Sequence, residues 1–202
     1  MRHFTKSTSM KKKFNIFFIF LIFIGCKQNE NKNTEIYNKE NKIVENNFVP
    51  KYGDSFFQFD EIEYYHNEIS EDEAMDLFDT QNKSQIDKLK FDIIIGEKPE
   101  SLNNLEFINS LSQIGFTRSQ INQSKFKEIN QIFTEKTVYE NYAAACVAVY
   151  RDILVFKNNK KIVGFCKLCF DCRLFRMIGT NANTENFGQD GDFEKLSNLL
   201  KN

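Results

Sequence analysis

The fold class follows from one stretch in the C-terminal third of the chain, Val147-Ala148-Val149-Tyr150-Arg151-Asp152-Ile153-Leu154-Val155-Phe156. Its β-branched and aromatic composition predicts a strand. Because the side chains of a strand alternate between two faces, Ile153 and Val155 share one face while Leu154 and Phe156 share the other. Apolar residues on both faces predict a central strand of a sheet.

Two further β-prone runs follow this strand, at residues 162–170 and 174–178. The first two runs are separated by Asn158-Asn159-Lys160, a turn composition that tolerates positive φ. The second and third runs are separated by Asp171-Cys172. The C-terminal third therefore predicts a three-stranded antiparallel meander.

Upstream of the meander, strand and helix signals alternate. Residues 56–65 are rich in aromatic side chains and predict a strand, and residues 91–95 predict a buried strand that stops at Gly96. Ser70 and Glu73 have the spacing of a capping box, in which each side chain satisfies a free N–H at the start of a helix.

Two adjacent helices are predicted next, at residues 102–111 and 117–133, from their apolar side chains at helical spacing. Gly115 stands where a C-terminal cap belongs, and Thr117 stands at the start of a second capping-box spacing. A two-residue joint predicts that these helices form an antiparallel pair. With a last amphipathic helix at residues 193–200, the chain predicts an α+β fold, an antiparallel sheet with helices packed on one face.

The N-terminus has the pattern of a secretory signal. Lys11-Lys12-Lys13 precedes an apolar run at residues 14–25. A membrane-spanning helix needs about 20 apolar residues, so this run is too short to span comfortably. Residues 1–25 are therefore predicted to be a signal peptide, and Met10 is a better placed start than Met1.

The segment Phe23-Ile24-Gly25-Cys26 resembles the lipobox of bacterial lipoproteins. The resemblance implies that Cys26 is diacylated, for example with palmitate, and becomes the new N-terminus. Two acyl chains anchor a protein stably to a membrane. Residues 26–47 are strongly polar and predict a flexible tether. Residues 48–202 remain for one globular domain.

The charge of the chain argues against a nucleic-acid partner. The sequence contains 27 basic and 28 acidic side chains, and all five charged side chains before Cys26 are basic. The part from Cys26 onward therefore carries a net charge of about −6, whereas nucleic-acid binding needs a basic surface.

The remaining cysteines are the chief candidates for chemistry. Cys146, Cys166, Cys169 and Cys172 are candidates for a disulfide or a redox pair, and an exported compartment favours disulfides. Across a tight turn, Cys169 and Cys172 would face each other at a distance that a disulfide accepts. Three positions separate Cys166 from Cys169, so these two point to opposite faces of a strand, which weakens a zinc interpretation.

Other polar pairs carry weaker signals. Arg151 and Asp152 point to opposite faces of a strand, so each is expected to pair with a neighbouring strand or helix. Glu63 and His66 lack the second histidine of a metalloprotease motif. The sequence predicts no catalytic residue set, no resident metal and no cofactor.

Three segments resemble an uncharacterised family of exported proteins from Bacteroidetes-type bacteria: residues 150–157, 169–172 and 186–189. The resemblance implies export and a defined fold, and it transfers no activity. We expect a lipoprotein of the cell membrane or outer membrane, a binding or structural module without enzymatic activity. Its expected partners are the membrane and an envelope protein, contacted by the sheet face or the loop of residues 181–191. The alternative is a thiol redox or metal-handling protein that uses Cys169 and Cys172.

Overall fold

The computed structural model describes residues 52–137 and 145–201. All of them belong to one compact unit, Asn46–Asn202. The predicted signal peptide, Cys26 and the tether of residues 26–47 lie outside the described residues.

The centre of the fold is a five-stranded antiparallel sheet with the order β3-β2-β5-β6-β7. The strands are β2 (Glu61–His66), β3 (Thr117–Gln120), β5 (Asp152–Asn158), β6 (Lys161–Cys169) and β7 (Leu174–Ile178). The last three form the predicted meander, and β5 occupies the predicted central position. A separate two-stranded sheet pairs β1 (Tyr52–Ser55) with β4 (Thr134–Lys136).

The turn between β5 and β6 has the predicted chemistry. Asn159 and Lys160 both have positive φ, 48° and 64°, which is the backbone of a two-residue hairpin turn. The turn between β6 and β7 is longer than predicted, because Cys169 pairs with Leu174 and four residues lie between them.

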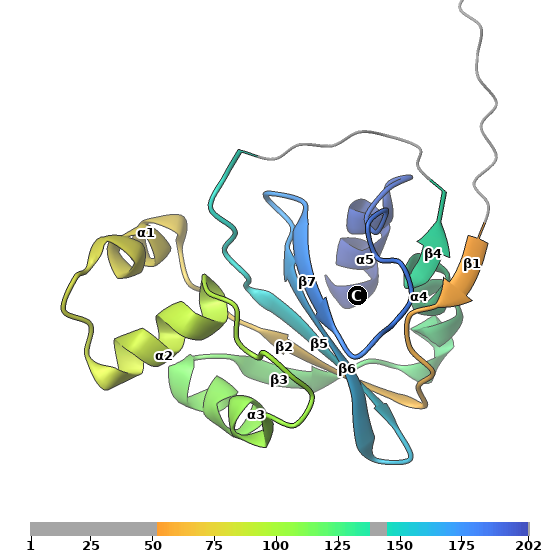
Figure 1. The fold of residues 1–202 in the computed structure, drawn as a ribbon, viewed down its shortest axis with the longest axis horizontal. Coiled ribbons are helices and arrows are strands. Elements are labelled where there is room, and N and C mark those ends of the chain that lie inside the picture. Colours follow the sequence, from red (N-terminus) through yellow and green to blue (C-terminus); the bar gives the residue numbers. More distant parts are fainter. Residues whose placement is uncertain (1–51, 138–144, 202) are drawn as a thin grey trace, which may run out of the picture. The chain divides into compact units, whose positions relative to one another are not determined.

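Helices cover both faces of the sheet, which corrects the prediction that they pack on one face (Figure 1). On one face, Ile153 and Val155 pack with α1 (Glu71–Asp79), α2 (Gln85–Ile94) and α3 (Leu105–Leu111). On the other face, Leu154 and Phe156 pack with α4 (Phe126–Ile132) and α5 (Asp192–Lys201). The physical reason lies in β5, whose two apolar faces both need cover from water.

Residues 91–95 are mostly helical, so the predicted buried strand is wrong. They form the last turn of α2, whose start is capped by the Ser84 side chain accepting the Asp87 N–H. Ile93 and Ile94 are fully buried against the sheet. A short apolar run fits either a strand or a helix by periodicity alone, and the cap upstream decides for the helix.

The predicted helix pair is also wrong, because a strand separates its members. Gly115, with a φ of 94°, ends the short 3-10 turn Ser112–Ile114 and reverses the chain. Thr117 then begins β3, which pairs with β2 in the register His66 to Thr117. A second 3-10 turn, Gln123–Lys125, leads into α4. α3 and α4 consequently lie on opposite faces of the sheet (Figure 1).

Two other predictions hold in whole or in part. Ser70 and Glu73 form the predicted capping box of α1. The predicted strand at 56–65 begins only at Glu61, and Phe56 and Phe57, which precede it, are core side chains about 4% and 3% exposed.

Candidate functional site

An open groove of about 860 Å³ lies beside α4. Its walls come mainly from three parts of the chain: the segment from β1 to β2, α4 itself, and the start of the loop after β7. Glu135 of β4 and Asn158 of β5 complete the lining. Asn181 and Ala182 line it, so the groove includes the beginning of the loop that the sequence indicated as a contact surface.

A glycine shapes the floor of this groove. Gly164 on β6 lies under the ring of Phe57, and a Cβ atom there would come within 2.2 Å of the Phe57 Cε1 atom. Phe57 in turn stacks on Phe156, with ring centroids 4.6 Å apart. Because glycine has no side chain, the Phe57 ring can pack directly against β6 at residue 164.

Two half-buried rings continue the aromatic lining. Phe59 and Phe126 meet edge to face, with centroids 5.3 Å apart, and both line the groove. Edge-to-face contact is a favoured arrangement for aromatic pairs and holds the two rings in place.

A carboxylate ties the wall of β1 to the wall formed by the loop. Glu135 Oε1 accepts the Asn183 N–H at 2.6 Å, and Glu135 Oε2 accepts the Asp54 N–H at 3.4 Å. Gly53 permits this approach, because a Cβ atom there would lie 2.4 Å from Glu135 Oε2. The polar wall is therefore positioned before any ligand arrives.

Three side-chain amides in the groove are available to a ligand. They belong to Gln58, Asn130 and Asn181, one from each wall segment, and no other described residue hydrogen-bonds to them. By contrast, the Asn158 amide is already used, because its Nδ2 donates to the Gln58 carbonyl at 3.1 Å.

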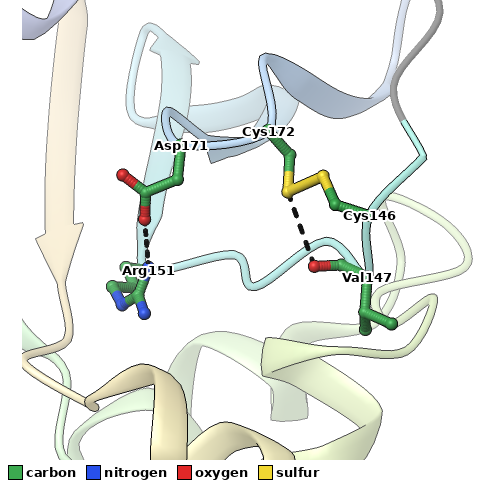
Figure 2. The surroundings of a disulfide bond; sticks show 5 residues. All are labelled: Cys146, Val147, Arg151, Asp171 and Cys172. Atoms are coloured by element: carbon green, nitrogen blue, oxygen red, sulfur yellow. Dashed lines mark hydrogen bonds and ion pairs between the residues drawn. A yellow bond between two sulfur atoms is a disulfide. The ribbon is translucent and has the colours of Figure 1, made fainter.

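One disulfide joins two of the four candidate cysteines, whose pairing the sequence left open (Figure 2). Cys172 is bonded to Cys146, with Cα atoms 6.3 Å apart, and not to Cys169 across the turn. The reason is the four-residue turn, which places Leu174 opposite Cys169. The disulfide joins the turn to the segment that precedes β5.

The other two cysteines, Cys166 and Cys169, are buried free thiols. Burial raises the pKa of the Cys166 thiol well above its usual value, so the reactive thiolate is disfavoured. They lie on opposite faces of β6, as the sequence predicted, with Cys166 in the core beside α4 and α5.

Next to the disulfide, Arg151 links the turn to the rest of the fold (Figure 2). Arg151 Nη1 contacts Asp171 Oδ2 at 2.7 Å, and Arg151 Nε donates to the Ile69 carbonyl at 2.7 Å. Arg151 and Asp152 thus do not pair with each other, as predicted. Asp152 contacts the neighbouring strand β2, whereas Arg151 contacts a turn and a loop instead of a strand or helix.

Asp152 belongs to a cluster that the sequence did not reveal. His66 Nδ1 lies 2.7 Å from Asp152 Oδ1, and the Tyr64 hydroxyl donates to the same oxygen. Burial, together with the Asp152 carboxylate, raises the pKa of Tyr64. The cluster borders a pocket of about 160 Å³ that Ser197 also lines. No sequence signal marks the cluster, because it depends on the strand register that sets His66 opposite Asp152, 86 residues away.

Glu63 and His66, the weak motif of the sequence, have separate partners. Glu63 is about 2% exposed and contacts Arg118, Lys157 and the Tyr65 hydroxyl. In residues 52–137 and 145–201, no group of three or more His, Cys, Asp or Glu side chains could hold a metal ion.

None of the helices in the described part of the chain has the length and apolar content that crossing a bilayer requires. Comparison of the sequence and the fold with known protein families, with curated proteins and with solved structures finds no match.

Proposed function

We propose that the protein is a lipid-anchored envelope protein whose domain binds a ligand or partner in the groove beside α4, without catalysing a reaction. The observation that carries the proposal is the groove itself. Its volume of about 860 Å³ lies within the range of ligand sites, roughly 300–1,000 Å³. It also offers three unengaged amides, one from each wall segment, and Glu135 holds the loop and β1 segments together.

Preorganisation supports a binding role. A ligand that enters this groove meets aromatic rings and wall backbone whose positions are already set, so less conformational entropy is lost on binding. The loop after β7 is tied to β4, because Glu135 accepts the Asn183 N–H, and the aromatic floor is packed into the core.

The anchor part of the proposal rests on the lipobox-like segment that ends at Cys26, outside the described residues. Mass spectrometry of the mature N-terminus and uptake of labelled palmitate test it. We expect label in the wild type and none in Cys26→Ala. A wild-type protein that takes up no label would contradict the anchor.

The binding part is tested by capture from envelope extract with the full-length protein in detergent. The bait carries either the wild-type groove or the double substitution Asn130→Ala and Asn181→Ala. The matched control is Asn109→Ala, an exposed asparagine on α3, on the other face of the sheet. We expect the wild type and the control to capture the same component and the groove variant to lose it.

Two results would overturn the proposal. Capture that is equal for all three baits would show that the groove is not the binding site. Turnover in a substrate screen that disappears in His66→Ala would make the protein an enzyme that uses the cluster of His66 and Asp152.

The thiol alternative is not favoured by the geometry. It needs Cys169 and Cys172 as a pair at an exposed turn, whereas Cys172 is bonded to Cys146 and Cys169 is about 2% exposed.

A further inference from the structure

The chemical character of the groove narrows the class of ligand. The side chains that line it are mainly neutral hydrogen-bonding groups and aromatic rings, with Lys127 as the cation and Asp54 and Glu135 as the carboxylates. One positive and two negative charges give no net attraction for a phosphate or another anion. The lining therefore suits a neutral ligand that is rich in hydrogen-bonding groups.

The unengaged amides match hydroxyl groups. Each amide of Gln58, Asn130 and Asn181 provides two donors and a two-lone-pair acceptor in one plane. A hydroxyl group is both donor and acceptor, so two neighbouring hydroxyls of a sugar ring can bond one amide through its N–H and its oxygen together. Three such amides on separate wall segments could hold several hydroxyl groups along a chain.

The aromatic side chains supply the apolar half of such a site. A sugar ring presents C–H groups on one face, and this face loses contact with water when it packs against an aromatic ring. Phe59 and Phe126 are half-buried rings at the groove, fixed by their edge-to-face contact. The two aromatic rings and the three side-chain amides thus line the same groove.

An extended peptide is a poorer occupant, because it would bind by adding a strand to free backbone groups. The backbone of the wall at residues 56–60 is already engaged. Phe56 N donates to the Phe133 carbonyl, the Gln58 carbonyl accepts from Asn158, and Asp60 N donates to the Lys157 carbonyl.

We propose that the groove beside α4 binds a neutral carbohydrate chain, through the amides of Gln58, Asn130 and Asn181 and the rings of Phe59 and Phe126. This inference rests on the proposed binding function and specifies the ligand class for the same groove.

The experiment is an array of neutral, acidic and basic oligosaccharides probed with the full-length protein in detergent, followed by calorimetry on the best ligand. The variants are Asn130→Ala, Asn181→Ala and Phe126→Ala, with Asn109→Ala as the control. We expect a neutral oligosaccharide to be selected. Each asparagine variant should weaken binding about 3- to 10-fold, the usual effect of losing one or two hydrogen bonds, and the control should leave it unchanged.

Asn181 keeps the test independent of folding, because it is exposed in a loop and its side chain bonds no other described residue. Absence of binding to every neutral oligosaccharide, or a preference for acidic ones, would overturn the carbohydrate proposal. If groove-dependent capture of a protein persists in that case, the binding function stands without the carbohydrate. If no component is captured through the groove, both proposals fail.

Discussion

Lys167 offers the sharpest physical test of this structure, because its ammonium group is buried in the fold. The side chain is about 1% exposed and extends from β6 toward the loop after α2. Its Nζ donates to the carbonyls of Gly96 and Lys98, at 2.8 and 2.9 Å, and lies 4.4 Å from the centroid of the Tyr150 ring.

Burial first, and then the nearby charge of Arg176, lower the pKa of Lys167 from 10.5 to about 7, while Glu97 opposes the shift. In the unfolded chain the lysine keeps its ordinary pKa and stays protonated up to about pH 10. Between pH 7 and 10 the unfolded state therefore binds more protons than the folded state. The free energy of unfolding must rise with pH in this window.

The magnitude follows from the two pKa values. Raising the pH from 7 to 8.5 should add about 1.6 kcal/mol to the free energy of unfolding through Lys167 alone. The hydrogen bonds survive the loss of the proton, because a neutral amine still has two N–H groups for the two carbonyls.

The assay is urea unfolding of the wild type and of Lys167→Met at pH 7 and pH 8.5, followed by circular dichroism. The quantity to compare is the change in the free energy of unfolding between pH 7 and pH 8.5 in each protein. Methionine also removes hydrogen bonds, but it does so at both pH values, so that loss does not affect the comparison. The buried thiols and tyrosines are common to both proteins, so their titration cancels. Equal pH dependence in the two proteins would refute the inference that burial controls this lysine.

Three other substitutions test separate features of the fold by the same unfolding assay. Replacing Cys146 and Cys172 together by serine should lower the free energy of unfolding by about 3 kcal/mol, because the disulfide closes a loop with a sequence separation of 26. An unchanged free energy of unfolding would show that the bond does not form. Gly164→Ala should cost about 1–3 kcal/mol, because the new methyl group would collide with the Phe57 ring; a neutral effect would contradict the close packing under the groove. Ser70→Ala should cost about 1 kcal/mol through loss of the capping box, and a cost near zero would mean that the cap does not stabilise α1.

Features that depend on near neighbours were predictable from the sequence. The hairpin at Asn159 and Lys160, the cap at Ser70 and the left-handed Gly115 each involve backbone within a few residues. The meander was predictable for the same reason, because its strands are consecutive and short turns join them. These elements determine the fold class, and they could be predicted without knowing which distant residues contact each other.

Two segments adopt a structure that differs from the prediction. Residues 91–95 fitted a strand or a helix by periodicity, and the cap at Ser84 places them at the end of α2. Residues 117–120 were predicted as the start of a helix, and their pairing with β2 makes them a strand. The placement of helices on both faces was implicit in the two apolar faces of β5. The prediction that helices pack on one face of the sheet would leave the other apolar face of β5 exposed to water.

The sequence by itself determined the α+β class, the meander and the central position of β5, because these follow from local periodicity and turn chemistry. Only the tertiary structure decided which distant residues meet. The bond between Cys146 and Cys172, the contact of His66 with Asp152 and the groove between β1, α4 and the loop at residues 181–182 all join parts of the chain that are far apart in sequence. Such contacts depend on strand register and on which loops close over the core, and no local pattern records either of them.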